Sequence, residues 1–211
     1  MSSIADIRIE YKKQRLLETD VANDPITQFS KWWDAAVKSE IFEVNAMTLA
    51  TVTEQGLPAA RIVLLKGFDE KGFVFFTNYQ SNKGHDLATN PHACLVFFWA
   101  ALERQVRISG TVEKVSAADS DTYFASRPAS SKIGAWSSPQ SNIIEKREVI
   151  EENAAAFKLQ FNDDIPRPPH WGGYIVKPSL IEFWQGRPSR LHDRILYTLE
   201  GNDWKIERLA P

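Results

Sequence analysis

The sequence predicts a mainly β protein, built as an antiparallel barrel with helices packed outside it. Runs rich in β-branched and aromatic residues lie at 47–52, 61–66 and 73–77, and glycine-containing turns separate them. Their connections are too short for the crossover helices of a parallel sheet, so antiparallel pairing is expected. With 43% hydrophobic residues in 211, the chain can bury one large core, and we expect a single domain over 21–211.

One amphipathic helix precedes these strands. Asp24 suits the N-cap and Pro25 the first helical position, and apolar residues then recur at spacings of three and four. This pattern predicts a helix over 25–39. Residues 1–20 mix charges with sparse apolar positions, which favours a helix or an arm that orders only on binding.

The rest of the chain continues with strands around a helical insert. A short helix is expected to start near Ser81, and residues 116–161 favour helix except for a Pro- and Ser-rich interruption at 128–142. Further strands are expected at 93–100, 103–115, 172–176, 180–184, 190–199 and 203–208.

Composition and missing motifs exclude several classes of function. The formal net charge of −2 gives no basic field for nucleic acid or an anionic membrane. The single cysteine, Cys94, excludes an intrachain disulfide, and the four scattered histidines predict no metal site. No G-x-G-x-x-G, Walker or G-x-S-x-G motif occurs, so any phosphorylated ligand must be held by side-chain cations. Without a secretory leader or a membrane-length apolar run, a cytoplasmic protein is expected.

Two cations bracket the strand expected at 61–66. Arg61 and Lys66 are five positions apart, and because side chains alternate between the faces of a strand, they are expected on opposite sides. They then serve different ligands or different ends of one site. The alternative, which this segment alone favours, is that both are solvated charges at strand ends.

A second group of cations lies near the C-terminus. Arg190, His192 and Arg194 share one face of the strand expected at 190–199 and span roughly 13 Å, at about 3.3 Å per residue. Two phosphorylated ligands would relieve the repulsion between these cations, because guanidinium groups bind phosphate bidentately. Ion pairs with Asp or Glu on a neighbouring strand would do so equally well. Trp184, just before this strand, is expected in the core or in the wall of a planar cofactor site.

Several short motifs share their order and spacing with one known family. They are Arg61-Ile62-Val63-Leu64-Leu65-Lys66, Leu102-Glu103-Arg104-Gln105-Val106, Ser126-Arg127-Pro128, Ile133-Gly134-Ala135-Trp136, Gln140-Ser141, Phe183-Trp184-Gln185-Gly186 and Arg190-Leu191-His192-Asp193-Arg194. On these motifs the chain resembles, nearly end to end, the pyridoxine/pyridoxamine 5′-phosphate oxidases. The resemblance implies a mainly β fold, an antiparallel split β-barrel that binds FMN, with surrounding α-helices.

The resemblance also implies which residues bind which ligand. Residues that would hold FMN are Arg61, Ile62, Val63, Leu64, Leu65, Lys66, Phe76, Thr77, Asn82, Lys83, Gln105, Gln140, Ser141, Trp184 and Arg194. Substrate would be bound by Arg8, Tyr11, Lys66, Tyr123, Arg127, Ser131, Arg190 and His192, the last two in catalytic positions over its ring. Residues 1–20 would form an arm that covers the active site. A homodimer with FMN sites at the subunit interface is implied.

Two positions depart from the family pattern. Asn82 stands where many members have Arg, and Phe76 stands where Tyr is common. A lost charge-assisted hydrogen bond costs about 1.5–3 kcal/mol when buried. Weaker FMN binding is therefore expected, with Arg61 and Lys83 making more of the phosphate contact.

The activity implied by the resemblance is oxidation of pyridoxine 5′-phosphate and pyridoxamine 5′-phosphate to pyridoxal 5′-phosphate. FMN would accept the hydride, and O2 would reoxidise it with release of H2O2. Another split-barrel flavoprotein, such as a flavin reductase, is the nearest alternative. A carrier that binds flavin or pyridoxal phosphate without catalysis, or a purely structural dimer, would be a different class.

Overall fold

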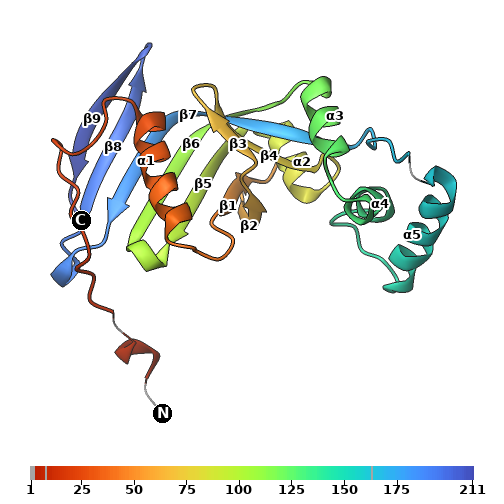
Figure 1. Cartoon of the computed structure of the whole chain (residues 1–211), viewed down its shortest axis with the longest axis horizontal. Helices are drawn as coiled ribbons and strands as arrows, with labels where there is room; N and C mark the ends of the chain where they lie inside the picture. The colour runs from red at the N-terminus through yellow and green to blue at the C-terminus, as the bar shows by residue number, and fades with distance from the viewer. Residues whose placement is uncertain (1–2, 8, 163) are drawn as a thin grey trace. The chain divides into compact units, whose positions relative to one another are not determined.

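Nine strands form one mainly antiparallel sheet in the part of the chain that the computed structural model describes, residues 3–7, 9–162 and 164–211 (Figure 1). The strand order is β2-β1-β5-β6-β7-β4-β3, and β8 pairs with both β7 and β9. The strands are β1 (Ala46–Val52), β2 (Pro58–Leu64), β3 (Gly67–Asp69), β4 (Gly72–Asn78), β5 (His92–Trp99), β6 (Arg104–Lys114), β7 (Trp171–Gln185), β8 (Asp193–Glu200) and β9 (Asp203–Leu209).

Five α-helices accompany this sheet in the described residues. They are α1 (Pro25–Lys38), α2 (Asn82–Thr89), α3 (Ala117–Ala125), α4 (Ala129–Ser137) and α5 (Glu148–Phe161). Short 3-10 turns lie at Ile4–Asp6, Ala100–Leu102 and Pro188–Arg190. No helix in the described residues combines the length and apolar character needed to span a lipid bilayer.

The described chain divides into two compact units, each assembled from segments far apart in the sequence. The first unit comprises Met1–Leu49, Cys94–Gly110 and Pro178–Pro211, and the second comprises Ala50–Ala93 and Thr111–Lys177. A single domain over 21–211, with an arm at 1–20 that covers the active site, stays a prediction.

Helix α1 packs its apolar face on strands of the first unit. Its N-cap is Asp24, whose Oδ1 accepts the backbone N–H of Thr27 at 2.7 Å. From this helix, Trp32 meets Phe183 of β7 edge-on, with ring centroids 5.2 Å apart. Phe29 is fully buried and packs against strand β5. The helix expected from the apolar spacing is therefore confirmed.

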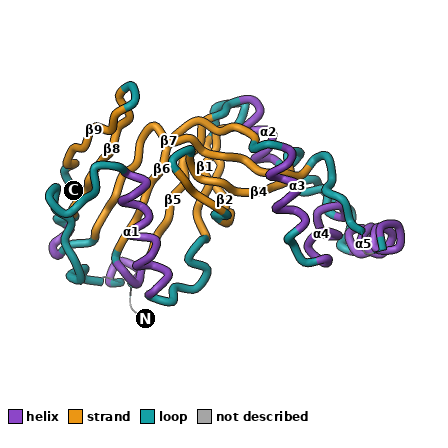
Figure 2. Tube along the Cα trace, turned by 45° about the horizontal axis from the view of Figure 1, so that its top comes forward, coloured by secondary structure: helices purple, strands orange, loops and turns teal. Residues whose placement is uncertain are grey.

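In the second unit, helices α4 and α5 lie side by side (Figures 1 and 2). A small apolar core of Phe124, Ile165 and Trp171 holds this helical part to strand β7. Trp136 of α4 packs against it and donates from Nε1 to the carbonyl of Pro166 at 2.7 Å.

The interruption expected at 128–142 is only partly right, since residues 138–142 are not helical, and the expected break between two strands at 177–179 is wrong. The Pro- and Ser-rich stretch 128–142 contains α4, because Pro128 stands just before the first helical turn, where a proline is tolerated. The strands expected at 172–176 and 180–184 form the single strand β7. Pro178 lies between the stretch of β7 paired with β4 and the stretch paired with β8, so its missing N–H interrupts neither of these ladders.

The strand expected at 190–199 starts later than its pattern indicated. Ser189 and Arg190 have φ of 56° and 62°, in the left-handed region that a strand cannot contain. Strand β8 therefore begins at Asp193. Arg190, His192 and Arg194 do not share one face of a strand, and that prediction is wrong.

Candidate active site

A pocket of about 480 Å³ opens in the second unit. This volume lies within the range of small-molecule sites, about 300–1,000 Å³. Its lining comes from β2, β4, α2, α3, α4 and β7 and from the loops that follow them. The lining residues are Ile62, Val63, Leu64, Lys66, Phe76, Thr77, Asn78, Lys83, Tyr123, Arg127, Pro128, Ser131, Gln140 and Trp171.

Three nearly parallel aromatic rings form one wall of this pocket. Phe76 stacks on Tyr123 with ring centroids 3.9 Å apart and planes 19° apart. Phe76 also stacks on Trp171, with ring centroids 5.5 Å apart and planes 13° apart. Stacking of this kind requires no hydroxyl at position 76, so phenylalanine there preserves a flat apolar wall.

The polar side of the pocket is cationic. Lys66, Lys83 and Arg127 line it, and none of the described lining residues carries a carboxylate. The Arg127 guanidinium lies 4.5 Å from the centre of the Trp171 ring. Its Nη1 is buried without a hydrogen-bond partner among the described residues, and burial lowers the pKa of Arg127. Because buried donors are almost always satisfied in folded proteins, this atom indicates a ligand that brings an anionic acceptor.

Lys83, at the start of α2, has a further cation near it, Arg61 of β2. Lys83 is buried and donates from Nζ to the Ser81 hydroxyl at 3.1 Å. Burial lowers the pKa of Lys83, the charge of Arg61 lowers it further, and Asp86 acts in the opposite direction. Arg61 itself donates to the Thr51 hydroxyl at 2.6 Å and pairs with the buried carboxylate of Asp86 at 3.4 Å. Thr51 donates in turn to Asp86 at 2.6 Å, so Thr51 and Asp86 together orient Arg61.

Arg61 and Lys66 line different depressions, but β2 ends at Leu64, so Lys66 lies outside the strand and the expected alternation of faces does not apply to it. Lys66 lines the 480 Å³ pocket, whereas Arg61 and Asn82 line a smaller depression beside Asp86. Asn82 is exposed there, and a longer cationic side chain at this position would not have to be buried.

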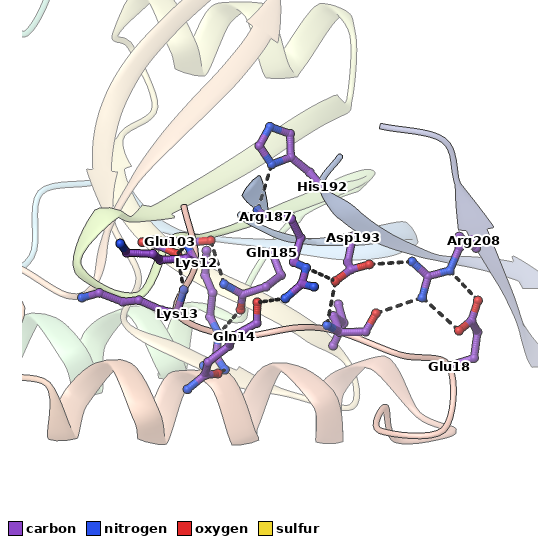
Figure 3. Close-up of polar contacts among 12 residues, drawn as sticks. Lys12, Lys13, Gln14, Glu18, Glu103, Gln185, Arg187, His192, Asp193 and Arg208 are labelled. Atoms are coloured by element: carbon purple, nitrogen blue, oxygen red, sulfur yellow. Dashed lines mark hydrogen bonds and ion pairs between the residues drawn. The ribbon is translucent and has the colours of Figure 1, made fainter. Parts of the chain in front are cut away.

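The first unit holds a separate cluster of aromatic rings. Trp184 and His192 have ring centroids 4.6 Å apart, and Tyr11 meets the two rings at 5.6 and 5.9 Å. The Nδ1 of His192 accepts the backbone N–H of Arg187 at 3.1 Å (Figure 3). Burial lowers the pKa of His192, the charge of Arg190 adds to this, and Asp193 opposes it. His192 is therefore neutral near pH 7, and with Nδ1 accepting, its proton lies on Nε2.

Arg194 belongs to an ion-pair network. It donates from Nε to the buried carboxylate of Glu182 at 2.8 Å and from Nη1 to the carbonyl of Ala210 at 2.8 Å. Arg107 contacts the other oxygen of Glu182 at 3.0 Å. For Arg194, the ion-pair alternative left open by the sequence is confirmed.

Comparison with known proteins identifies the family. Residues 33–161 match the family model described as pyridoxamine 5′-phosphate oxidase. The chain belongs to this family. Residues 171–211 match the model for a pyridoxine 5′-phosphate oxidase C-terminal dimerisation region, which indicates a homodimer.

Three relatives show how far the likeness to this oxidase family extends. A pyridoxine/pyridoxamine 5′-phosphate oxidase from Cyanothece sp. is 59% identical over 210 residues, 99% of each chain. PhzG from Burkholderia lata, solved with tetrahydrophenazine-1-carboxylic acid, is 31% identical with a TM-score of 0.87, covering 93% of this chain and 98% of its own. A pyridoxamine 5′-phosphate oxidase-related, FMN binding protein from Nostoc punctiforme has a TM-score of 0.72 at 19% identity, covering 90% and 100%, and shows the fold alone.

These matches confirm the family and the antiparallel split barrel with helices that the sequence predicted. An oxidoreductase is the general class that the family model and the curated relative support.

Most of the residues expected at the site fall into two groups, apart from Arg61 and Asn82 in the smaller depression. The pocket of the second unit brings together those expected for both FMN and substrate, namely Ile62, Val63, Leu64, Lys66, Phe76, Thr77, Lys83, Tyr123, Arg127, Ser131 and Gln140. Tyr11, Gln105, Trp184, Arg190, His192 and Arg194 belong to the first unit. Leu65 is buried, Ser141 is exposed outside the pocket lining, and Arg8 lies outside the described residues. Their roles stay predictions.

Sequence reasoning missed five residues that the structure brings to these places. Asn78, Pro128 and Trp171 line the pocket, and Asp86 and Glu182 hold the arginines expected to bind FMN. Pro128 lies within the motif Ser126-Arg127-Pro128, so it is the one of these five residues that the sequence could most readily have indicated. No local pattern marks the other four, because their partners are distant in the chain.

The pocket residues fit an FMN cofactor and a phosphorylated substrate. A flat aromatic wall, several cations and the buried Nη1 of Arg127, which has no hydrogen-bond partner among the described residues, suit a planar, anionic ligand. No cluster of His, Cys, Asp and Glu suited to a metal ion occurs among the residues described.

Proposed function

We propose that this protein is an FMN-dependent oxidase that converts pyridoxine 5′-phosphate and pyridoxamine 5′-phosphate to pyridoxal 5′-phosphate. The observation that carries the proposal is the buried Nη1 of Arg127, which has no protein partner among the described residues and lies in a carboxylate-free pocket. A phosphate group supplies several anionic acceptors for such a donor. The 59% identical oxidase over 99% of each chain supports the same reaction.

The roles of the pocket residues follow from their chemistry. Lys66, Arg127 and Ser131 would bind the substrate phosphate, with Tyr123 beside them in the aromatic wall. Binding energy from this remote group would align the carbon to be oxidised. FMN, when bound, would supply the hydride acceptor, and O2 would take up the two electrons with two protons to give H2O2. With pyridoxamine 5′-phosphate the oxidised product is an imine, which water would hydrolyse to the aldehyde with release of ammonia.

FMN would be held mainly by hydrogen bonds and by cations. Thr77, Lys83 and Gln140 line the same pocket and can donate to an anionic or carbonyl oxygen. Arg61 would contact the phosphate from the neighbouring depression, in the orientation that Thr51 and Asp86 impose. FMN sites at the interface of a homodimer are part of the proposal, and so is a cytoplasmic location.

Arg190 and His192 would meet the substrate ring. Neutral His192 has its Nδ1 occupied by the Arg187 amide, so its Nε2–H is available as a hydrogen-bond donor. This arrangement favours an orienting role for His192 over that of a general base. Arg190 is exposed and adopts a strained left-handed backbone, which is common where a side chain must reach a ligand.

A second candidate function rests on the likeness to PhzG, which was solved with a tetrahydrophenazine carboxylic acid. Such a ligand carries one carboxylate and no phosphate. The Lys66 and Arg127 cations favour the more highly charged phosphate ester, so we expect the phosphorylated vitamin to be the substrate.

Peroxide release by the FMN-loaded protein tests these alternatives. We expect oxidation of both phosphorylated substrates, poor oxidation of unphosphorylated pyridoxine, and little oxidation of a tetrahydrophenazine carboxylate. Arg127→Ala should raise the KM for pyridoxine 5′-phosphate about 10- to 100-fold, the factor for one charged hydrogen bond, with FMN affinity nearly unchanged. Arg147→Ala, at an exposed arginine of the same unit, is the matched control.

Each alternative predicts a different result in this assay. An unchanged KM in Arg127→Ala would remove the phosphate clamp. Ligand binding without peroxide would favour a carrier, and flavin reduction by a nicotinamide cofactor would favour a reductase.

A further inference from the structure

Glu103 lies in the motif 102–106, and the proposed function gives this residue no chemical role. Its side chain is 6% exposed, and its Oε2 accepts the backbone N–H groups of Lys12 and Lys13, each at 2.9 Å (Figure 3). A buried carboxylate requires donors of this kind, because its desolvation is otherwise costly. The N-terminal segment supplies these donors from about 90 residues away in the chain.

The backbone at Glu103 carries strain that favours a different residue type. Its φ of 55° and ψ of 39° place it in the left-handed region, at the end of the 3-10 turn Ala100–Leu102. Glycine or asparagine occupies such a position at lower cost. A glutamate that tolerates this conformation indicates that its side chain has a task elsewhere.

Glu103 also binds the end of strand β7, against which Tyr11 packs. The Glu103 carbonyl accepts the N–H of Gly186 at 2.7 Å and that of the Gln185 side chain at 3.2 Å. Gly186 leaves room for Tyr11, because a Cβ on it would lie 2.7 Å from the Tyr11 Cγ. One residue thus binds both the peptide that follows Tyr11 and the strand end that carries Trp184.

We propose that Glu103 is a positioning residue that holds Tyr11 against Trp184 and His192 and thereby preserves substrate affinity. This inference rests on the proposed function for its kinetic consequence, whereas the anchoring itself is independent of it. Glu103 acts through Tyr11 and the rest of the N-terminal segment. It does not itself contact a ligand.

Trypsin digestion of the full chain, with and without FMN, measures the anchoring directly. Lys12, Lys13 and Arg15 have exposed side chains, so the bonds that follow them become cleavable when the segment detaches. Glu103→Ala should be cleaved there about tenfold faster than the wild type. Glu103→Gln should be cleaved at nearly the wild-type rate, because its amide oxygen still accepts the two N–H groups. Glu113→Ala, at an exposed glutamate, is the control.

Kinetics of the same proteins test the consequence for substrate. Glu103→Ala should raise the KM for pyridoxine 5′-phosphate about tenfold while the Kd for FMN changes less than about twofold. Gly186→Ala, whose Cβ would lie 2.7 Å from the Tyr11 Cγ and 3.0 Å from the Glu103 Cβ, should displace Tyr11 and raise the KM in the same way. It also keeps the test open if Glu103→Ala does not fold.

The results that would overturn the inference are distinct from failure of the proposed function. Unchanged trypsin cleavage in Glu103→Ala would disprove the anchor, whatever reaction the protein catalyses. Faster cleavage with an unchanged KM, or an unchanged KM in Gly186→Ala, would disprove the positioning of Tyr11. If the wild type shows no oxidase activity, the proposed function fails while the cleavage result still decides the anchor.

Discussion

At the scale of single residues, Lys83 keeps a positive charge in an unfavourable place. It is 8% exposed, and burial together with the nearby charge of Arg61 lowers its pKa from the ordinary 10.5. A bound phosphate would reverse this, because an opposite charge favours the protonated amine. Lys83 is therefore a residue whose protonation should be coupled to cofactor binding.

This coupling predicts how FMN affinity depends on pH. The neutral fraction of Lys83 grows as pH rises through its lowered pKa, so FMN should bind more weakly on the alkaline side, before pH 10.5 is reached. Lys83→Arg should retain affinity across that range, because arginine stays protonated. Fluorescence titration of FMN between pH 7 and 10 measures both proteins, with Lys177→Arg as control. Parallel curves would show that Lys83 does not contact the phosphate.

At the scale of elements, the N-terminal segment is held at a second place by β9. Arg208 contacts both carboxylate oxygens of Glu18, the carbonyl of Leu16 and the Asp193 carboxylate (Figure 3). Asp193 in turn accepts the N–H of Leu16 at 3.0 Å. Because Asp193 directly follows His192, the segment and the loop with His192 share one network of ion pairs.

Acid should weaken this second attachment in a defined window. The hydrogen bond from Arg208 lowers the pKa of Glu18 from 4.5 to about 2. The stability that Glu18 contributes is therefore complete above pH 4.5 and is lost as pH falls towards 2. Glu18→Gln should have a slightly lower Tm than the wild type at pH 6, and the difference should vanish near pH 2.

Thermal unfolding across this range, at low and high salt, provides the measurement. The side chain of Glu18 is exposed, so its contribution should be small and should shrink with added salt. Glu145→Gln, at an exposed glutamate in the other unit, controls for loss of a carboxylate. A Tm difference that persists at pH 2 would exclude the ion pair as its cause.

At the scale of the whole molecule, the match of residues 171–211 to a dimerisation region indicates a homodimer. Ile62 and Leu64 line the pocket and are 64% and 36% exposed. Neighbouring exposed apolar side chains of this kind often mark a ligand-binding or protein-protein contact surface. A second subunit or the cofactor ring would cover them. This supports the proposed FMN sites at the subunit interface.

Mixed dimers test whether each site takes residues from both subunits, as the family resemblance implies. Lys83→Ala changes the pocket and His192→Ala changes the aromatic cluster, so each homodimer should be weakly active. If one site combines the pocket of one subunit with the cluster of the other, half of the sites in a mixed dimer are intact. Random mixing should then restore about a quarter of wild-type peroxide production.

The control for this experiment mixes two pocket variants, Lys83→Ala and Arg127→Ala. Every site in that mixed dimer retains one altered pocket, so no activity should return. Recovery in neither mixture would show that each site belongs to a single subunit.

Local patterns in the sequence determined the elements whose signals are short-range. Helix α1 follows from the Asp24 cap, Pro25 and the apolar spacing, and the antiparallel strands follow from period-two runs between glycine turns. Ordered motifs were enough to recognise the family, and with it a pocket that gathers Lys66, Tyr123 and Arg127.

Only the tertiary structure decided which groups are partners. Glu182 pairs with Arg194, Asp86 pairs with Arg61, and Glu103 binds the N-terminal segment. Each of these contacts joins residues that are far apart in the chain. The left-handed backbone at Arg190 and the continuity of β7 through Pro178 likewise follow from neighbouring strands and loops. The free energy of a buried charge or a strained turn depends on what surrounds it after folding, and no local pattern of residue types specifies those surroundings.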